Sequence, residues 1–203
     1  LGSQSRESKG VRPQYSNMKI SLLHPTFFRE GGPTELRNQW LNSASFPDRI
    51  EYLFAVTESD ENAMGATAAF PRVVVEPNAV GSTAVRNWNT LAAVASGDLL
   101  FVIADDLEPA EEGWDSLLEE LLGGWNPVVH SFALKINDNG DQFDTQLRHP
   151  IISRRYFEKH GLWDASYRGM WVDRDLTLKA FWRSQILDGR SLRFTHRNPI
   201  LDH

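Results

Sequence analysis

The chain of 203 residues contains no cysteine, which excludes disulfide bonds and thiolate metal ligands. It also lacks an excess of basic side chains, since 27 aspartates and glutamates stand against 21 lysines and arginines. A broad positive surface for nucleic acid is therefore not expected. No apolar run is long enough for a membrane-spanning helix, and the first residues, LGSQSRESKG, lack the apolar stretch of a signal peptide. We expect a soluble, cytoplasmic protein.

The remaining composition is that of an ordinary globular protein, with 41% hydrophobic and 24% charged residues. A chain of this length forms one well-buried domain and is short for two. The polar segment 1–17 is therefore expected to be a flexible leader, and residues 18–203 are expected to form the folded domain.

Apolar and amphipathic segments alternate over the first half of the chain. This pattern predicts strands at 18–25, 49–59, 71–78 and 99–103, and helices at 33–44 and 81–97. Such alternation is typical of an α/β domain, whose sheet is flanked by helices and binds ligands beyond the carboxyl ends of its strands. The second half is less regular. It is predicted to hold helices at 111–124, 152–161 and 172–189, with strands at 126–136 and 191–196.

Two adjacent carboxylates, Asp105 and Asp106, follow directly on the apolar run 99–103. Like charges this close disfavour each other unless a cation lies beside them. Carboxylate oxygens suit a hard divalent ion such as Mg²⁺ or Mn²⁺, which typically bridges phosphate groups. The other interpretation is a solvated loop, because adjacent acids are common in loops.

The segment 78–109 resembles the donor half of the family 2 glycosyltransferases, which have the GT-A fold. The family motifs are matched here, in order, by Gly81, Val85-Arg86-Asn87, Gly97-Asp98 and Ala104-Asp105-Asp106. The resemblance implies that Asp106 binds a divalent metal, that Asp105 lies at the donor, and that Arg86 faces the nucleotide diphosphate. Ala104 departs from the family pattern, which has an acid at that position. Two alternatives stay open for the metal: Asp105 substitutes for the missing acid, or Asp106 and the nucleotide phosphates suffice.

The segment after the first strand, HPTFFR, resembles the family's nucleotide-binding segment. The resemblance implies donor contacts from Pro25, Thr26, Phe27 and Arg29, and a base can stack on an aromatic ring such as that of Phe27. After the second strand the family places an acid that reads the base. The segment VTESDEN offers Glu58 or Asp60 for this role, although a plain turn residue is the slightly better explanation of either acid.

The segment GLWDASYRGMWVDRDLTLKAF, residues 161–181, resembles the acceptor side of the same family. The resemblance implies that Asp173 is the catalytic base, because a carboxylate beside the acceptor hydroxyl can take its proton. The alternative for Asp173 is an acid favoured by the dipole at a helix N-terminus. Val172 departs from the family, which has a glutamate there. Trp163 and Trp171 precede Asp173 in the same segment and are interpreted as a stacking platform for a sugar, with His149 lining the same acceptor side.

A late histidine completes the metal site in many GT-A enzymes. The resemblance assigns this role to His203, with His196 as the competing candidate.

The resemblance spans residues 18–203, with a donor half at 18–109 and an acceptor half at 110–203. It implies a mixed, mostly parallel sheet and an inverting glycosyltransferase that needs Mn²⁺ or Mg²⁺. The implied donor is a nucleotide sugar, first of all a UDP-sugar. The acceptor stays open among a glycan, a small molecule, a protein and a modified base.

Two other functions stay open. Ala104 and Val172 stand where the family has acids, and the absence of these two acids favours a non-catalytic sugar- or nucleotide-binding module of the same fold. A sugar-phosphate nucleotidyltransferase has a similar scaffold, but it normally needs a basic glycine-rich loop, and HPTFFREGGP contains no lysine.

Overall fold

The computed structural model describes residues 18–27, 32–75, 83–138, 141 and 143–197. Within them the strands are β1 (Ile20–Pro25), β2 (Ile50–Thr57), β3 (Arg72–Val75), β4 (Leu99–Val102), β5 (Leu107–Pro109), β6 (Ala133–Asn137), β7 (Ile151–Ser153) and β8 (Ile186–His196). The helices are α1 (Pro33–Asn42), α2 (Glu61–Ala66), α3 (Ala84–Val94), α4 (Trp114–Leu122), α5 (Arg154–His160) and α6 (Val172–Trp182), and a short 3₁₀ helix lies at Pro47–Arg49.

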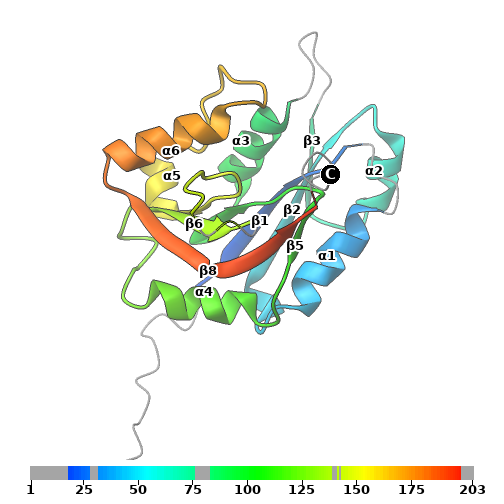
Figure 1. Cartoon of the computed structure of the whole chain (residues 1–203). Helices are drawn as coiled ribbons and strands as arrows, with labels where there is room; N and C mark the ends of the chain where they lie inside the picture. The colour runs from blue at the N-terminus through cyan, green and yellow to red at the C-terminus, as the bar shows by residue number, and fades with distance from the viewer. Residues whose placement is uncertain (1–17, 28–31, 76–82, 139–140, 142, 198–203) are drawn as a thin grey trace, which may run out of the picture.

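The strands form one mixed sheet in the order β3-β2-β1-β4-β7-β6-β8-β5 (Figure 1). The first four strands in this order are parallel to one another, and so are β6 and β8. The strand β7 runs antiparallel to both of its neighbours, and β5 runs antiparallel to β8. The α/β fold class predicted from the sequence is therefore confirmed.

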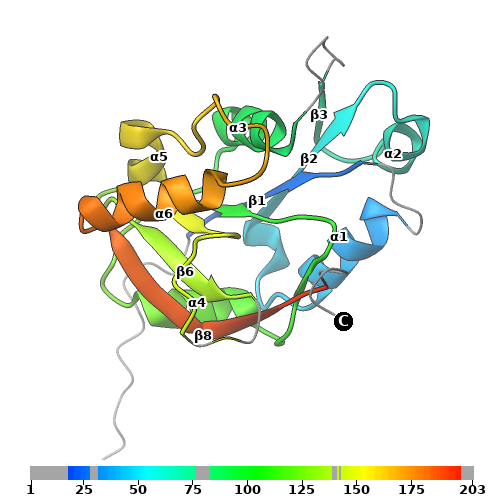
Figure 2. The same cartoon turned by 45° about the horizontal axis from the view of Figure 1, so that its top comes forward.

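Helices cover both faces of the sheet, with α1 and α4 on one side and α3, α5 and α6 on the other (Figures 1 and 2). Neighbouring residues of a strand therefore enter different cores, as Leu22 packs in the cluster of Trp40 whereas Leu23 packs in the cluster of Leu91. Strands buried on both faces have continuous apolar runs, which is why the sequence pattern revealed β1, β2 and β4.

The prediction of a long helix at 172–189 is wrong, because α6 ends at Trp182 and β8 begins at Ile186. Ser184 adopts a left-handed conformation with φ 54°, which breaks the helix. Gly189 lies within β8 and does not end a helix. A Cβ atom at Gly189 would lie 2.7 Å from Leu134 Cγ, so its role is to let β8 approach β6 closely.

Other predicted boundaries also shift. The strand predicted at 126–136 begins only at Ala133, since residues 126–130 form a turn in which His130 N donates to Asn126 O. The short elements α2, β5 and β7 were not predicted. The predicted leader, residues 1–17, lies outside the described residues.

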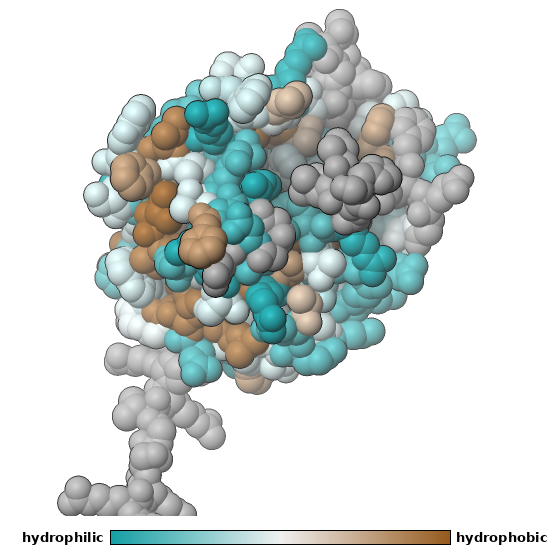
Figure 3. Space-filling model, in the orientation of Figure 1, coloured by the Kyte–Doolittle hydropathy of each residue, from teal (hydrophilic) through white to brown (hydrophobic). Residues whose placement is uncertain are grey.

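The exposed surface includes apolar side chains on the outer face of α6, Leu178, Phe181 and Trp182. In Figure 3 brown side chains gather on the left of the face shown, where α6 lies. Among the helices described, none combines the length and apolarity that crossing a bilayer requires.

Gly97 permits the close contact between the start of β4 and β1. A Cβ atom there would lie 2.5 Å from Ser21 Oγ and 2.7 Å from Ser21 N. We expect Gly97→Ala to lower the free energy of unfolding by about 1–3 kcal/mol, since the backbone must move. The control is Gly65→Ala in α2, where the added methyl group would meet no described atom within 4 Å. This substitution is expected to raise the free energy of unfolding slightly, because alanine favours a helix more than glycine does. Urea denaturation measures both, and equal losses would contradict this account.

Candidate active site

A pocket of about 340 Å³ lies at the carboxyl ends of β1 and β4. The two strands are adjacent and parallel, with Leu23 opposite Val102, so the residues that follow them lie side by side. The pocket is lined by Pro25, Thr26, Phe27, Ala84, Asn87, Trp88, Ala104, Asp105 and Asp106. Phe27 is 55% exposed at this site. Thr26 is buried, and its Oγ1 has no hydrogen-bond partner among the described residues.

Asp105 faces β1 and is held by a buried histidine. Its Oδ1 lies 2.9 Å from His24 Nε2, and His24 Nδ1 lies 2.7 Å from the Tyr52 hydroxyl. Burial, together with the charge of Asp105, raises the pKa of Tyr52. The tyrosine is therefore neutral, and its hydroxyl can donate to Nδ1 in the tautomer whose Nε2 donates to the Asp105 carboxylate. No local sequence pattern indicates a role for His24, because its partners lie 28 and 81 positions away.

Asp106 faces away from Asp105, toward two histidines. Asp106, His149 and His196 each offer one ligand atom, and these three atoms all lie within 4.8 Å of one another. The pairing of β5 with β8 places Leu107 opposite His196, so the end of β8 necessarily lies beside Asp106. Burial would raise the pKa of Asp106, but the hydrogen bond and charge of His196 lower it below its usual value. The adjacent acids thus diverge, as neighbours on an extended chain do.

The two histidines are positioned as metal ligands would be. His149 Nδ1 lies 3.0 Å from Asp138 Oδ2, which fixes that nitrogen as a donor and leaves Nε2 free. His196 Nδ1 is buried and has no partner among the described residues. Burial lowers the pKa of His149, so that its ring is neutral at pH 7. One carboxylate and two imidazole rings are a chemically suitable set for a divalent transition-metal ion.

A second pocket, also of about 340 Å³, adjoins the first and shares Trp88 with it. It is lined by Trp88, Gln146, Arg148, His149, Trp163, Gly169, Met170, Trp171, Val172 and Asp173. Trp171 is 59% exposed and has a left-handed backbone with φ 72°. That conformation is uncommon for a bulky side chain, and such strain is concentrated at functional sites.

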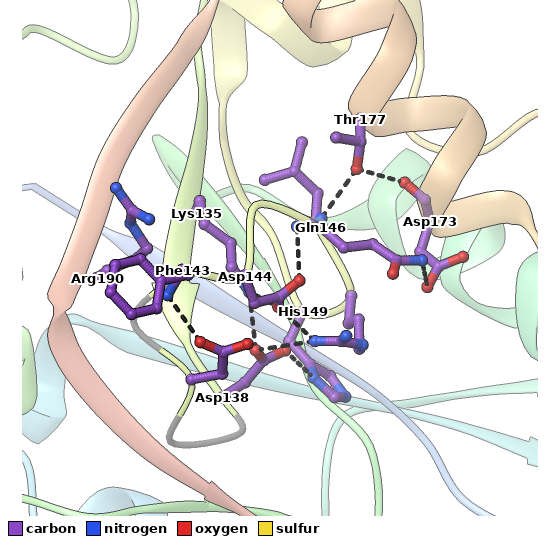
Figure 4. A network of polar contacts seen from close by, with 12 residues as sticks. Lys135, Asp138, Phe143, Asp144, Gln146, His149, Asp173, Thr177 and Arg190 are labelled. Carbon is purple, nitrogen blue, oxygen red and sulfur yellow. Dashed lines mark hydrogen bonds and ion pairs between the residues drawn. The ribbon is translucent and has the colours of Figure 1, made fainter.

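Asp173 lies in the first turn of α6 and is fixed from two sides. Its Oδ2 accepts a hydrogen bond of 2.6 Å from Gln146 Nε2, and its Oδ1 accepts one from Arg174 N. The Thr177 hydroxyl donates to the Asp173 carbonyl and accepts from Leu147 N, which ties this turn to the segment before β7 (Figure 4). Gln146 therefore orients the carboxylate toward the pocket that both residues line.

The fold and this site can be compared with known proteins. No model of a known protein family matches the chain, and no curated protein matches it at a significant level. Solved structures do match. Staphylococcus aureus TarS, residues 1–349 in complex with UDP, has a TM-score of 0.67 at 16% identity over 88% of this chain and 60% of that one. A mannosyltransferase from Pyrobaculum calidifontis, in complex with GDP-Man and Mn²⁺, has a TM-score of 0.68 at 13% identity over 94% and 59%.

A third match is glucosyl-3-phosphoglycerate synthase from Mycobacterium tuberculosis, in complex with Mn²⁺, UDP and phosphoglyceric acid. Its TM-score is 0.63 at 17% identity, over 91% of this chain and 72% of that one. The chain has the fold of the GT-A glycosyltransferases. It spans about three fifths of the length of the TarS chain and of the mannosyltransferase chain.

Within this GT-A fold the predicted site residues fall into four groups. Those that line the two pockets are Pro25, Thr26, Phe27, Asp105, Asp106, His149, Trp163, Trp171 and Asp173. Arg86 and Glu58 are exposed and line neither pocket. Asp60 is buried and accepts from Ala63 N as the N-cap of α2. Arg29 and His203 lie outside the described residues.

His196, the competing candidate for the late histidine, lies in the group with Asp106. His149, assigned from the sequence to the acceptor side alone, belongs to this group and also lines the second pocket. Asn87, Trp88 and Gln146 also line the pockets, and they were not predicted from the sequence. Asn87 was quoted only as part of the Val85-Arg86-Asn87 motif, and that motif was the available signal for it.

Proposed function

We propose that this chain is a metal-dependent glycosyltransferase that moves a sugar from a nucleotide-sugar donor to an acceptor hydroxyl with inversion. One observation carries this proposal: two adjoining pockets meet at Trp88, with the Asp106 cluster at the first and Asp173 in the second. Such a pair of pockets offers a place for a donor and for an acceptor, with a base on the acceptor side.

The first pocket is proposed to bind the nucleoside diphosphate. Phe27, more than half exposed, offers a ring on which a base can stack, and the unpartnered Thr26 hydroxyl offers a hydrogen bond. Asp105, held by His24, is proposed to contact the donor from the same pocket. We propose UDP as the nucleotide, because TarS and the glucosyl-3-phosphoglycerate synthase are solved with UDP. Arg86 and one of Glu58 or Asp60 remain proposed donor contacts on the resemblance alone.

Asp106, His149 and His196 are proposed to hold a divalent ion, Mn²⁺ or Mg²⁺. When bound, such an ion neutralises negative charge that develops on a departing diphosphate. The chain itself supplies the ligand atoms and their orientation. Asp138 orients the ring of His149 through a hydrogen bond, and the pairing of β8 with β5 places His196 beside Asp106.

Asp173 is proposed to act as the base. It takes the proton of the acceptor hydroxyl while that oxygen bonds to the anomeric carbon and the donor's phosphate oxygen leaves from the opposite face. Gln146 keeps the carboxylate oriented for this transfer. Trp163, Trp171 and His149 line the same pocket and are proposed to bind the acceptor.

A non-catalytic sugar- or nucleotide-binding module is the second candidate. Val172 supports it, because the position where the family has a glutamate is filled by a buried valine that packs in the core. Turnover of a donor would exclude this candidate.

The test is hydrolysis of a panel of UDP- and GDP-sugars, with MnCl₂ or with EDTA. We expect slow, Mn²⁺-dependent release of one nucleoside diphosphate by the wild type and its loss in Asp106→Ala. The control Asp48→Ala, an exposed acid in the 3₁₀ helix, is expected to keep full activity. No release from any donor with any metal would contradict the enzymatic function and favour the binding module.

A further inference from the structure

We propose that His149 serves as a metal ligand in place of the carboxylate that is missing at Ala104, with Asp138 as its positioning residue. As a consequence, the site prefers ions that accept imidazole ligands, such as Mn²⁺ or Co²⁺, over Mg²⁺. This inference rests on the metal-bearing donor site of the proposed function. It concerns ion binding alone, so it can be tested without any nucleotide sugar.

The ligand set differs from the one that the sequence motif implies. An Asp-x-Asp motif brings two carboxylates, but here the first position is Ala104, which lines the pocket without a ligand atom. Asp105, between them, is directed to His24 instead. The atoms that do gather at Asp106 are from two imidazole rings, whose centroids lie 4.7 Å apart. Mg²⁺ prefers oxygen ligands and keeps several waters. First-row transition ions bind imidazole more readily than Mg²⁺ does, and the affinity of such a site rises from Mn²⁺ to Co²⁺.

His149 is held in the orientation that a ligand requires. Its side chain is 6% exposed, and the carboxylate behind it, Asp138, is fully buried. The Nδ1–H donates to Asp138, which leaves the lone pair of Nε2 available to an ion. A carboxylate behind a ligating histidine fixes the ring tautomer and raises the basicity of the ligand.

Asp138 is in turn fixed by a buried cation. Lys135 Nζ lies 2.8 Å from Asp138 Oδ1 and 2.9 Å from Asp144 Oδ2, and Lys135 is 4% exposed (Figure 4). Burying such charges costs desolvation free energy that their attraction does not always offset. The ion pairs of Lys135 hold Asp138 in place, and Asp138 in turn orients His149. This positioning gives the buried charges a function despite their desolvation cost.

The experiment uses the full chain and MnCl₂ alone, and it begins with the wild type. Electron spin-echo envelope modulation of bound Mn²⁺ is expected to show coupling to two histidine nitrogens. Calorimetric titration is expected to give at least about tenfold tighter binding of Mn²⁺ than of Mg²⁺. Coupling to a single nitrogen, or equal affinities for the two ions, would overturn the proposal without the need for any variant.

Variants then separate the two roles. His149→Gln is expected to remove one nitrogen coupling, and Asp138→Asn to weaken Mn²⁺ binding by about 10–100-fold while both couplings remain. The control His130→Gln replaces an exposed histidine and is expected to change neither. An unchanged Mn²⁺ affinity in a folded His149→Gln would overturn the proposal. If Mn²⁺ binds with both couplings but no nucleotide sugar is hydrolysed, the proposed function fails and this inference stands.

Discussion

Asp173→Asn is expected to slow Mn²⁺-dependent donor hydrolysis, in which water replaces the acceptor, by about 10²–10⁴-fold. The amide keeps the size of the side chain but cannot take a proton. Because Asp173 lies in the second pocket, away from the residues that line the first, the affinity for UDP is expected to stay the same. Initial rates of UDP release and calorimetric titration with UDP measure the two effects separately.

Asp175→Asn is the matched control for this prediction. Asp175 lies in the same helical turn, but its carboxylate pairs with Lys179 at 2.6 Å and does not line the second pocket. Hydrolysis by Asp175→Asn is expected to remain near the wild-type rate. A similar loss in both variants would show that the helix end tolerates no loss of negative charge, and Asp173 would then not be identified as the base.

Lys135→Met is expected to lower the free energy of unfolding by about 3 kcal/mol, since it leaves the buried carboxylate of Asp138 without its nearest cation. Burial would raise the pKa of Asp138, but the hydrogen bond from His149 and the charge of Lys135 keep it well below its usual value. Asp138 thus remains ionised and buried at neutral pH. Urea denaturation at pH 7 measures the loss.

Lys19→Met is the control, because Lys19 is 43% exposed and forms an ion pair with Glu51 at 3.2 Å. Exposed pairs contribute little, so a change below about 1 kcal/mol is expected. If Lys135→Met were as mild as Lys19→Met, the buried network would not be the rigid support of Asp138 and His149 that we assign to it.

The first half of the fold was predictable from the sequence for a clear physical reason. The strands β1, β2 and β4 are buried on both faces and therefore read as continuous apolar runs. The helix α3 was recognisable from its amphipathic pattern and from its cap, where Thr83 accepts from Arg86 N.

The second half was less predictable because its short strands depend on partners far away in the sequence. The strands β5 and β7 have three residues each, too few for a periodic pattern. The strand β8 begins soon after α6, and its apolar and polar residues alternate less clearly. Gly189 is required by the close approach of Leu134, and a glycine is not typical of a strand by local preference.

The same limit applies to the site. Asp106 and Asp173 could be proposed from the sequence because each lies in a motif with fixed spacing. The role of His149 beside Asp106, and its support from Asp138, depends on where the segment between β6 and β7 folds back, which no local pattern specifies. His24 was missed for the same reason, as its two hydrogen bonds join β1 to β2 and to the end of β4.

The central claim is that the Asp106 cluster and the first pocket together bind a metal and a nucleoside diphosphate. The most direct test is calorimetric titration of the wild type and Asp106→Ala with UDP, in MnCl₂ and in EDTA. We predict that UDP binds the wild type at least about tenfold more tightly with Mn²⁺ than with EDTA, and that Asp106→Ala abolishes this difference. Equal UDP binding by both proteins with and without Mn²⁺, or no binding at all, would contradict the claim.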